Sequence, residues 1–367
     1  MVSNGRTRLL FRFFPLGPAR YRPTTEVKPP SAADDEKIDI VPSSKPCLRV
    51  STMEGGGERA AEAEEYHCHD FEWEDLRAEV EANPAFSYHL SPFPTTVGAP
   101  EKPPPPPPPS EAWTSFHRRH TSGKFFKERR YLLKEFPELL NSKDSAKVLE
   151  VGCGNGSTVV PILRSSPSTT VYACDCSKET LEKANEIVCS TKGVEVKDRF
   201  HPFLLDASNA AFPDWLFCKS CRSPCSSNCN MIEEYPAFLR DNPCCVGGVD
   251  FITMIFTLSA IPFDNMLATL ERCVSVLKPG GLVLFRDYGL YDMTMLRFLP
   301  HQRVGFREYM RSDGTLSYFF TLDTVRELFH ASGLLELELE YCCVISVNRK
   351  KGKKMQRVWV HGKFQKP

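Results

Sequence analysis

The sequence predicts an α/β fold in which a mostly parallel sheet is covered by helices on both faces. From Lys147 onward, short apolar runs alternate with segments whose apolar residues recur at helical spacing. The runs do not alternate polar with apolar residues, which indicates strands buried on both faces. The first run leads into a glycine-rich turn, and such a turn joins a strand to a helix in many α/β folds.

The predicted elements follow one another in βα order. The predicted strands, in chain order, are 147–151, 170–174, 203–205, 250–256, 282–285, 334–347 and 357–364. The predicted helices are 158–164, 178–189, 265–277 and 322–332. β-Branched residues favour the strand at 170–174, and an amphipathic pattern favours the helix at 265–277. The last two strands are expected to close the sheet as a pair.

The residues before this domain have a different composition. Thirty of the 367 residues are proline, and most of the excess over average usage lies in the first third of the chain. Residues 1–65 have no lasting period, which predicts a disordered or targeting extension. Residues 66–94 predict a short helical segment that docks on the domain, and residues 95–112, with seven consecutive prolines, predict a linker. The main domain is therefore expected over residues 113–367.

Targeting and compartment are predicted from composition. Residues 1–25 contain five arginines and no acid, as organellar transit peptides do, although a translated upstream stretch before Met53 is the alternative. Fifteen cysteines are scattered through predicted strands and helices, which favours reduced thiols and a cytoplasmic protein over a disulfide scaffold. No run of about 18 apolar residues occurs, so no membrane span is expected.

The charges balance in total but not in distribution. Lys and Arg number 46, as do Asp and Glu, which argues against a generic polyanion binder on totals alone. Residues 116–134 nevertheless carry seven basic residues against one acid, and residues 341–367 carry eight basic residues and no acid. Such segments are typical of a nucleic-acid-binding surface or of a solvated protein face.

Glycines and acids at three successive strand ends predict a nucleotide site. Gly152 and Gly154 follow the first strand, where they permit a tight turn and a close approach of the backbone to a ligand. Asp175 ends the second strand, where a carboxylate can accept hydrogen bonds from both ribose hydroxyls of an adenosine. Asp206 follows the third strand and is placed to accept from the adenine amino group. Each acid alone is equally typical of a helix cap or a loop, but the three features together favour the site.

These motifs together resemble the class I S-adenosylmethionine-dependent methyltransferases. The resemblance implies a Rossmann-like sheet of seven strands, six parallel and one antiparallel, with S-adenosyl-L-methionine as cofactor and no metal. More specific motifs resemble the methyltransferase-like enzymes that form 3-methylcytidine in tRNA, over about residues 113–367. They are Trp113, Phe116-His117, Lys124 to Arg129, Glu135 to Leu139, Ile255 to Ala260, Leu284 to Asp292, Leu296 to Phe298, Asp313 to Phe320 and Lys363 to Pro367. A shorter match, Asp70 to Trp73, resembles the extension of the branch that acts on threonine tRNA.

The resemblance also implies individual site residues. The expected cofactor-binding residues are Trp113, His117, Gly152, Gly154, Asp175, Asp206, Ala207 and Ile255. His117 departs from the family, which usually has a tyrosine there. Asp287 lies just past the fifth strand, so it is our candidate catalytic residue, accepting from the exocyclic amine of cytosine; its alternative role is an ion pair with Arg286. Trp113 and Phe125 are expected to close the base pocket.

Residues 213–248 form an insertion rich in cysteine. It contains Cys218-x-x-Cys221, followed by Cys225, Cys229, Cys244 and Cys245. A CxxC pair with further thiols is typical of a zinc site, yet the later spacing matches no two-knuckle zinc ribbon. Zinc binding and a flexible loop are both consistent with this pattern, and the expected site residues include no metal ligand.

The expected activity is the formation of 3-methylcytidine at nucleotide 32 of the tRNA anticodon loop. N3 of cytosine is a neutral lone pair at pH 7, so alignment of N3 with the methyl group is expected to matter more than a strong base. Threonine, serine and arginine tRNAs are the expected partners, with a helper protein such as an aminoacyl-tRNA synthetase. The alternatives are a class I methyltransferase acting on protein or a small molecule, and a non-catalytic cofactor-binding subunit. The residues expected to contact the tRNA backbone are Arg118, Arg119, Lys124, Lys127, Arg129, Arg130 and Lys350 to Lys354.

Overall fold

The computed structural model describes residues 39–40, 68–93, 109–119, 128–140, 145–222, 244–348 and 353–367. All of them belong to one compact unit that spans residues 36–367. Most of the predicted extension, 1–65, and residues 95–108 of the predicted linker lie outside the described residues. Within the described ranges, no helix has the length and apolar character needed to cross a membrane.

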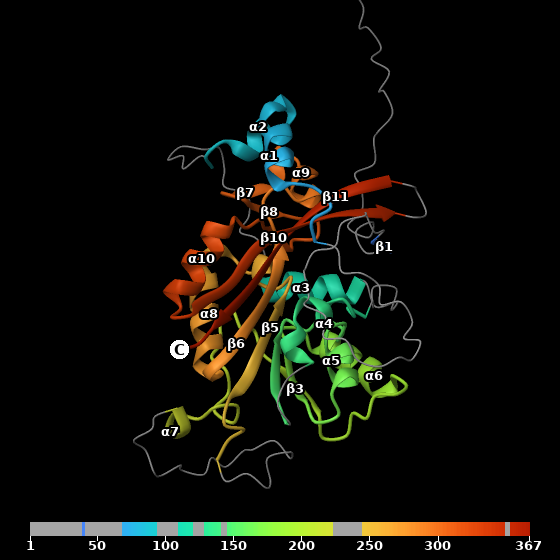
Figure 1. Ribbon diagram of the computed structural model, residues 1–367, viewed down its shortest axis with the longest axis vertical. Helices are drawn as coiled ribbons and strands as arrows, with labels where there is room; N and C mark the ends of the chain where they lie inside the picture. Colours follow the sequence, from blue (N-terminus) through green and yellow to red (C-terminus); the bar gives the residue numbers. More distant parts are fainter. Residues whose placement is uncertain are drawn as a thin grey trace, which may run out of the picture. The chain divides into compact units, whose positions relative to one another are not determined.

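A central sheet organises the domain (Figure 1). Its strands are β1 (Asp39–Ile40), β2 (Lys147–Val151), β3 (Thr170–Asp175), β4 (Phe200–Leu204), β5 (Val249–Ile255), β6 (Leu277–Tyr288), β10 (Leu335–Asn348) and β11 (Lys353–Gln365). Their spatial order is β1-β10-β11-β6-β5-β2-β3-β4. Strands β2 to β6 pair in parallel, whereas β11 pairs antiparallel with both β6 and β10. The predicted sheet of six parallel strands and one antiparallel strand is confirmed, and the two-residue β1 adds an eighth strand at the edge.

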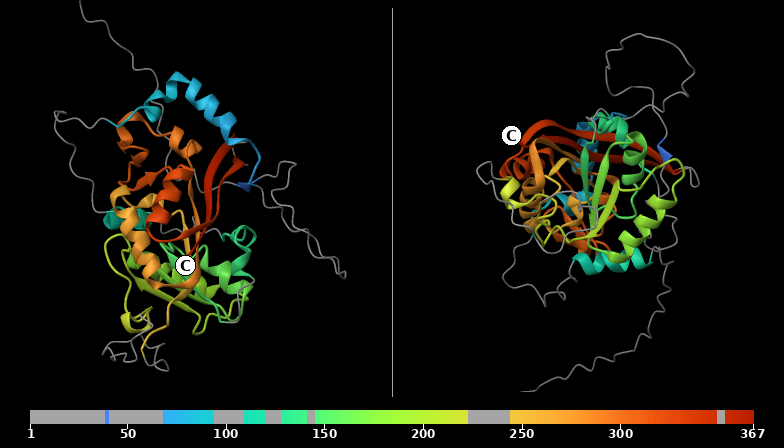
Figure 2. Two further views of the ribbon diagram at one scale, coloured as in Figure 1. Left: turned by 60° about the vertical axis from the view of Figure 1, so that its left-hand side comes forward. Right: turned by 90° about the horizontal axis from the view of Figure 1, so that it is seen from below.

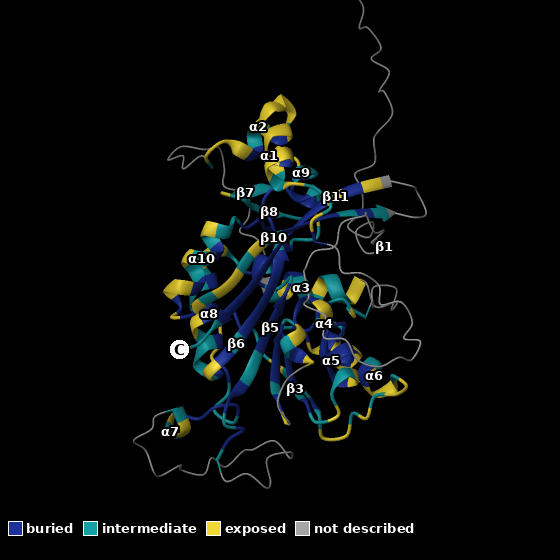
Figure 3. Ribbon diagram, viewed as in Figure 1, coloured by how far each residue is buried: buried dark blue, intermediate teal, exposed yellow. Residues whose placement is uncertain are grey.

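Helices cover both faces of the sheet because successive side chains along a strand point to opposite faces. Val148 and Val171 pack with α5 (Val159–Ser165) and α6 (Lys178–Ser190) on one face. Their neighbours Leu149 and Tyr172 pack on the other face with α8 (Phe263–Val276) and α10 (Leu322–Ala331). Figure 2 shows the sheet between these two groups of helices from two further directions, and Figure 3 shows that its central strands are mostly buried.

The predicted fifth strand, 282–285, is longer in the structure. Strand β6 runs from Leu277 to Tyr288 and includes the segment Lys278-Pro279-Gly280-Gly281, which the sequence indicates as a turn. The end of the chain holds this segment extended: Gly280 N donates to Lys366 O at 2.8 Å, and Lys366 N donates to Gly281 O at 2.9 Å. The extension therefore depends on pairing with residues about 85 positions away, which local sequence does not report.

A second, small sheet was not predicted. It consists of β7 (Arg303–Gly305), β8 (Glu308–Met310) and β9 (Leu316–Tyr318), paired in that order. Strands of three residues are too short to show a periodic pattern, so sequence periodicity could not indicate them. Within the predicted helical segment 66–94 lie two further short helices, η2 (Pro84–Phe86) and α2 (Ser87–Leu90). Short helices in the described residues that were not predicted are α4 (Leu132–Glu135), α7 (Lys219–Arg222), α9 (Met293–Leu296), η3 (Pro137–Leu139), η5 (Leu258–Ala260) and η6 (Pro300–Gln302).

The segment before the linker forms helix α1 (Trp73–Ala82), which packs on the domain. Its buried residues Leu76 and Val80 join a cluster that includes Tyr309 of β8. Trp73 stacks on Tyr341 of β10 with ring centroids 4.9 Å apart, and its Nε1 donates to Leu290 O at 3.1 Å. The motif Asp70 to Trp73 therefore joins this helix to the main sheet.

Helix α3 (Pro109–Arg119) begins inside the range predicted as linker. Proline is favourable at the first position of a helix, because its fixed φ suits the helix and its missing N–H has no partner there anyway. The last of the seven consecutive prolines thus starts a helix. Helix α3 packs beside α6 and brings the residues expected near the cofactor close to the sheet.

Candidate functional site

The candidate site lies at the carboxyl ends of the parallel strands, the edge at which α/β sheets bind ligands. The glycine-rich turn follows β2, Asp175 is the last residue of β3, Asp206 follows β4 and Phe256 follows β5. Strands β2, β3 and β4 are neighbours in the sheet, and β5 lies on the other side of β2. The sheet therefore brings together the three strand ends from which the sequence predicted the site.

Two glycines of the turn have different surroundings. Gly152 has φ +70°, and a Cβ there would lie only 2.5 Å from Cγ2 of Thr257, the residue that follows Phe256. Gly154 has φ +53°, and a Cβ there would meet nothing within 4 Å. Both conformations favour glycine. The turn is therefore packed tightly against the end of β5 at Gly152 and is open at Gly154.

Asp175 is buried, with 8% of its surface exposed, and it joins the turn to the next helix. Its Oδ2 accepts from Gly154 N and its Oδ1 accepts from Ser177 N, both at 3.0 Å. Ser177 in turn caps α6, since its Oγ accepts from Thr180 N. A carboxylate offers about four acceptor positions, so two remain for ribose hydroxyls after these bonds.

Asp206 has more local partners than the sequence suggested. Its Oδ1 accepts from Ser208 N at 3.0 Å and from Ser208 Oγ at 2.6 Å, and its Oδ2 accepts from the Asn209 side chain at 2.9 Å. These bonds shape the turn after β4, which was the alternative role of this acid. The neighbouring Ala207 is buried, and so is Ile255 at the end of β5. A contact of Asp206 with adenine stays a prediction.

Helix α3 places Trp113 and His117 near the end of β3. The two rings lie 5.9 Å apart on one side of the helix, and Phe116 is also in contact with both. Arg118 forms an ion pair at 3.2 Å with Glu179, in the first turn of α6. Since α6 begins directly after Asp175-Cys176-Ser177, this contact sets α3 beside the glycine-rich turn.

The side chain of Arg129 is partly buried next to the glycine-rich turn and does not belong to an exposed basic surface. Its Nη1 donates to Thr158 Oγ1 at 3.2 Å, and its backbone N donates to Ser157 O at 3.0 Å. Burial raises the pKa of Glu150, beneath the turn, to about 8, and the nearby charge of Arg129 opposes that rise. The expectation that Arg129 binds tRNA phosphate is therefore corrected: its guanidinium is held at the glycine-rich turn.

Of the other basic residues expected to contact tRNA, some are exposed in the structure and some lie outside the described residues. Arg118 pairs with Glu179, and Arg130 pairs with Glu128 at 3.3 Å, but both arginines are exposed. Arg119 is exposed and bonds only to backbone oxygens in the described structure. The positions outside the described residues are Lys124, Lys127, Lys350 and Lys351, together with Phe125, which was expected at the base pocket.

Asp287 does not occupy the position expected of a catalytic residue. Its side chain is fully buried, and its two oxygens accept from Ser259 N at 2.9 Å and from Tyr288 N at 2.8 Å. Burial raises the pKa of Asp287 to about 6. A carboxylate with no exposed surface cannot touch a base, so this expectation is corrected: Asp287 holds the loop η5 after β5 in place.

The alternative, an ion pair between Asp287 and Arg286, is also wrong. The two residues are neighbours in β6, so their side chains point to opposite faces of the sheet. Arg286 is buried and pairs with Glu135 of α4 at 2.5 Å, and Glu135 also contacts Nδ1 of His361 at 3.0 Å. Burial alone would raise the pKa of Glu135, but Arg286 and His361 hold it below its usual value. The motif Glu135 to Leu139 thus anchors the segment before β2 to β6 and β11.

An aromatic cluster beside the strand ends was missed by the sequence reasoning. Phe256 has φ +56°, a conformation that is uncommon for a bulky residue and concentrates at functional sites. Its ring lies 5.0 Å from that of Tyr288, the last residue of β6, and 6.2 Å from that of Trp359 of β11. Trp359 is 8% exposed, and its Nε1 has no hydrogen-bond partner within the described part of the chain. Because the indole Nε1 is itself buried, the surfaces that the cluster presents at the strand ends are the partly exposed rings of Phe256 and Tyr288.

Comparisons with known proteins agree with this geometry. A family model described as a methyltransferase domain matches residues 120–338. The chain is 34% identical over 325 residues to a protein of Drosophila melanogaster named tRNA N(3)-methylcytidine methyltransferase, with 85% of this chain and 89% of that one covered. It is 34% identical over 259 residues to a human tRNA N(3)-cytidine methyltransferase, with 70% and 79% covered. It is also 35% identical over 240 residues to a Dictyostelium discoideum protein named O-methyltransferase 3, with 64% and 47% covered.

Proposed function

The chain belongs to the family of tRNA N(3)-cytidine methyltransferases, and from this membership we propose that its target is a cytidine in the anticodon loop, at nucleotide 32. S-adenosylmethionine is the cofactor of this family. A loop nucleotide suits the reaction, because N3 lies on the Watson–Crick edge and that edge must be unpaired to reach the cofactor.

The residues at the strand ends fit the cofactor. Asp175 retains acceptor capacity for a ribose, and the open space at Gly154 allows a ligand to approach the backbone. When bound, S-adenosylmethionine supplies a methyl group attached to a positively charged sulfur. In the proposed arrangement Asp175 orients the ribose, and Trp113 and His117 of α3 cover the cofactor from the side of α6.

The aromatic cluster of Phe256, Tyr288 and Trp359 is the observation that carries the proposal for the base. Aromatic side chains bind unpaired bases by stacking, and Phe256 and Tyr288 are partly exposed, whereas Trp359 is buried beside them. The cluster adjoins the ends of β5 and β6, next to the glycine-rich turn after β2. A base stacked there would lie beside the cofactor site.

The surroundings of this cluster suit a base that becomes positively charged on methylation. Two guanidiniums contact the Trp359 ring, with the Cζ atoms of Arg286 and Arg357 4.4 Å and 5.3 Å from the ring centroid. Each arginine is paired, Arg286 with Glu135 and Arg357 with Asp292 at 2.9 Å. The positive charges of the two arginines are therefore largely neutralised by their carboxylate partners. The aromatic faces of the cluster then favour the positive charge that develops on the base during methylation.

Proton transfer has a small role in this proposal. N3 carries a lone pair at pH 7, so no residue has to remove a proton from it before attack. Asp287 acts as a positioning residue, since its buried carboxylate fixes Ser259 in η5 and so the backbone that follows Phe256. Alignment of N3, methyl carbon and sulfur supplies most of the rate.

The test is a methyl-transfer assay with two tRNA transcripts that differ only in carrying cytidine or uridine at nucleotide 32. We expect nucleoside mass spectrometry to detect 3-methylcytidine in the cytidine transcript alone, with cell extract added if a helper protein is needed. Trp359→Phe should lower turnover by about 5- to 150-fold, as expected from 1–3 kcal/mol per stacked or hydrogen-bonded base, and leave cofactor affinity unchanged. Leu337→Ala, which truncates an exposed side chain near the start of β10 and at the other end of the sheet, serves as the control.

Other outcomes would contradict the proposal. Equal methylation of the uridine transcript would exclude cytidine 32 as the target. Methylation of protein, or of an oxygen in a small molecule, with no methylated tRNA would favour the second class of function, which the similarity to an O-methyltransferase of Dictyostelium discoideum makes worth measuring. A cytoplasmic location stays a prediction from the sequence.

A further inference from the structure

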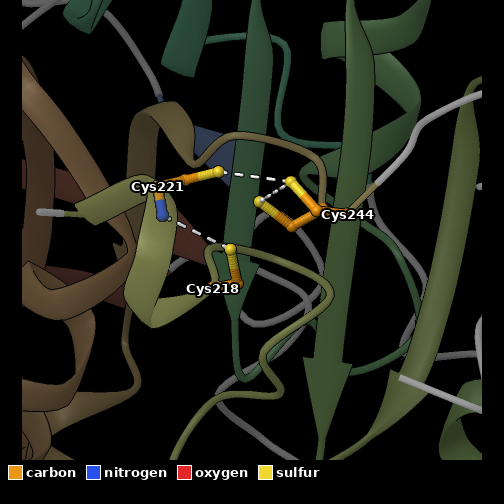
Figure 4. A group of neighbouring side chains, drawn as sticks. Cys218, Cys221 and Cys244 are labelled. Atoms are coloured by element: carbon orange, nitrogen blue, oxygen red, sulfur yellow. Dashed lines mark hydrogen bonds between the residues drawn. The ribbon is translucent and has the colours of Figure 1, made fainter. Parts of the chain in front are cut away.

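Four cysteines of the insertion 213–248 converge in the structure (Figure 4). Cys218 and Cys221 lie at helix α7, and Cys244 and Cys245 lie just before β5. Their sulfur atoms all lie within 4.8 Å of one another, although 23 residues separate Cys221 from Cys244. The cysteines Cys225 and Cys229 lie outside the described residues. The two ends of the insertion therefore lie close together at these four cysteines.

The spacing of the sulfurs suits a tetrahedral metal ion. Zinc binds thiolates at about 2.3 Å, which places the corners of an ideal tetrahedron about 3.8 Å apart. The Sγ atoms of Cys221 and Cys244 are 3.3 Å apart, and those of Cys244 and Cys245 are 4.0 Å apart. Both values lie close to that edge length and well beyond a disulfide bond of about 2.05 Å. None of the four cysteines is in a disulfide.

Backbone N–H groups point at two of the sulfurs, which is an independent observation. Cys221 N donates to the Sγ of Cys218 at 3.4 Å, and Gly247 N donates to the Sγ of Cys245 at 3.3 Å. Hydrogen bonds from backbone N–H groups to sulfur are a common feature around metal-bound cysteines, where they orient the ligand atoms. Gly247 has φ +82°, which allows the chain to turn back over Cys245.

The surroundings supply partial burial and positive charge. Cys218 and Cys245 are buried, at 8% and 6% exposed. Four thiolates around a divalent ion carry a net charge of −2, so nearby cations favour the complex. Lys147 donates to Val246 O at 2.5 Å, directly after Cys245, and Arg222 directly follows Cys221 and donates to Phe217 O at 2.6 Å.

We propose that Cys218, Cys221, Cys244 and Cys245 bind one zinc ion, which closes the insertion at the amino end of β5. Binding converts four thiols to thiolates and releases four protons for each zinc ion bound. The site lies at the end of β5 opposite to Phe256, so it takes no part in methyl transfer. Its role is structural: the ion fixes residues 244–248, which lead directly into the central strand β5.

The test is the zinc content of the purified full-length protein, prepared with a thiol reductant. We expect about one zinc per chain by plasma mass spectrometry, and Cys221→Ser and Cys244→Ser should each lower this content at least about fivefold. Cys189→Ser, which changes an exposed thiol on α6, is the matched control and should keep its zinc. Replacement of zinc by cobalt(II) in the wild-type protein should give the visible absorption of a tetrahedral thiolate site.

The cobalt spectrum keeps the test decisive even if a cysteine variant fails to fold. A wild-type chain that is folded by circular dichroism, yet binds less than about 0.1 equivalent of zinc or cobalt(II) after reconstitution, would overturn the proposal. So would zinc that persists in both variants. Alkylation followed by peptide mass spectrometry identifies disulfides, and a disulfide between Cys221 and Cys244 in the reduced preparation would overturn it as well.

Discussion

Replacing Gly152 by alanine tests how the glycine-rich turn packs on the end of β5. The new Cβ would lie 2.5 Å from Cγ2 and 2.7 Å from Oγ1 of Thr257, and Oγ1 is held by the bond that it donates to Val151 O at 2.9 Å. The left-handed backbone of Gly152 adds roughly 1–2 kcal/mol for alanine, and displacing Thr257 adds about 1–3 kcal/mol. We therefore expect Gly152→Ala to lower the free energy of unfolding by roughly 2–5 kcal/mol.

Gly154→Ala is the matched control, because it shares the backbone conformation without the clash. Its Cβ would meet nothing within 4 Å, so only the backbone cost of roughly 1–2 kcal/mol applies. The open space faces the proposed cofactor site, and we expect this variant to lose at least about tenfold in affinity for S-adenosylmethionine. Urea denaturation measures the stability of both variants, and calorimetric titration measures their affinity.

Thr257→Ala in the Gly152→Ala background separates the two contributions. Removing the Thr257 side chain relieves the clash, so the double variant should recover about 1–3 kcal/mol relative to the sum of the single changes. Equal losses of stability in Gly152→Ala and Gly154→Ala, with no recovery in the double variant, would refute the inferred packing of the turn on Thr257.

Two further predictions concern buried acids. The pKa of Asp287 is raised by burial to about 6 from an ordinary 3.8, so the folded protein binds more protons between pH 4 and 6 and its stability falls as pH rises through that window. Urea denaturation should show a loss of up to about 3 kcal/mol there that Asp287→Asn lacks, and parallel pH curves would contradict this. Burial likewise raises the pKa of Glu150 to about 8, and a cationic cofactor favours its ionised form. Affinity for S-adenosylmethionine should therefore rise from pH 6 to 8 in the wild type but less in Glu150→Gln, and equal slopes in calorimetric titrations would exclude this linkage.

Local sequence predicted well the strand ends at which the candidate cofactor residues lie. The strand at 147–151 has the predicted bounds, and the strand that ends at Asp175 differs by one residue. The reason is that each feature lies within a few residues of a strand end: an apolar run, then glycines or an acid. In a parallel sheet the carboxyl ends of neighbouring strands lie at one edge, so the approach of these residues does not depend on contacts elsewhere in the chain.

The aromatic cluster could not be predicted in the same way. Phe256, Tyr288 and Trp359 come from three strands, and Trp359 reaches the cluster only through the antiparallel pairing of β11 with β6, in which it lies opposite Tyr288. No local pattern reports this pairing. The cysteine cluster is a similar case. The sequence favoured a flexible loop over zinc, because a CxxC motif does not show that Cys244 and Cys245 approach it, and only the folded chain shows this.

The end of β6 provides the physical reason for proposing aromatic residues as the contacts of the base. Arg286 and Asp287 are its last charged residues, and the alternation of the strand turns them to opposite faces. Arg286 is neutralised by Glu135, and both oxygens of Asp287 accept backbone N–H groups, so both side chains are occupied within the fold. Tyr288 is the next residue and is only partly buried. In the proposed site, therefore, a base that becomes a cation on methylation would meet aromatic faces at the end of β6, and we expect the geometry of those faces to select cytosine.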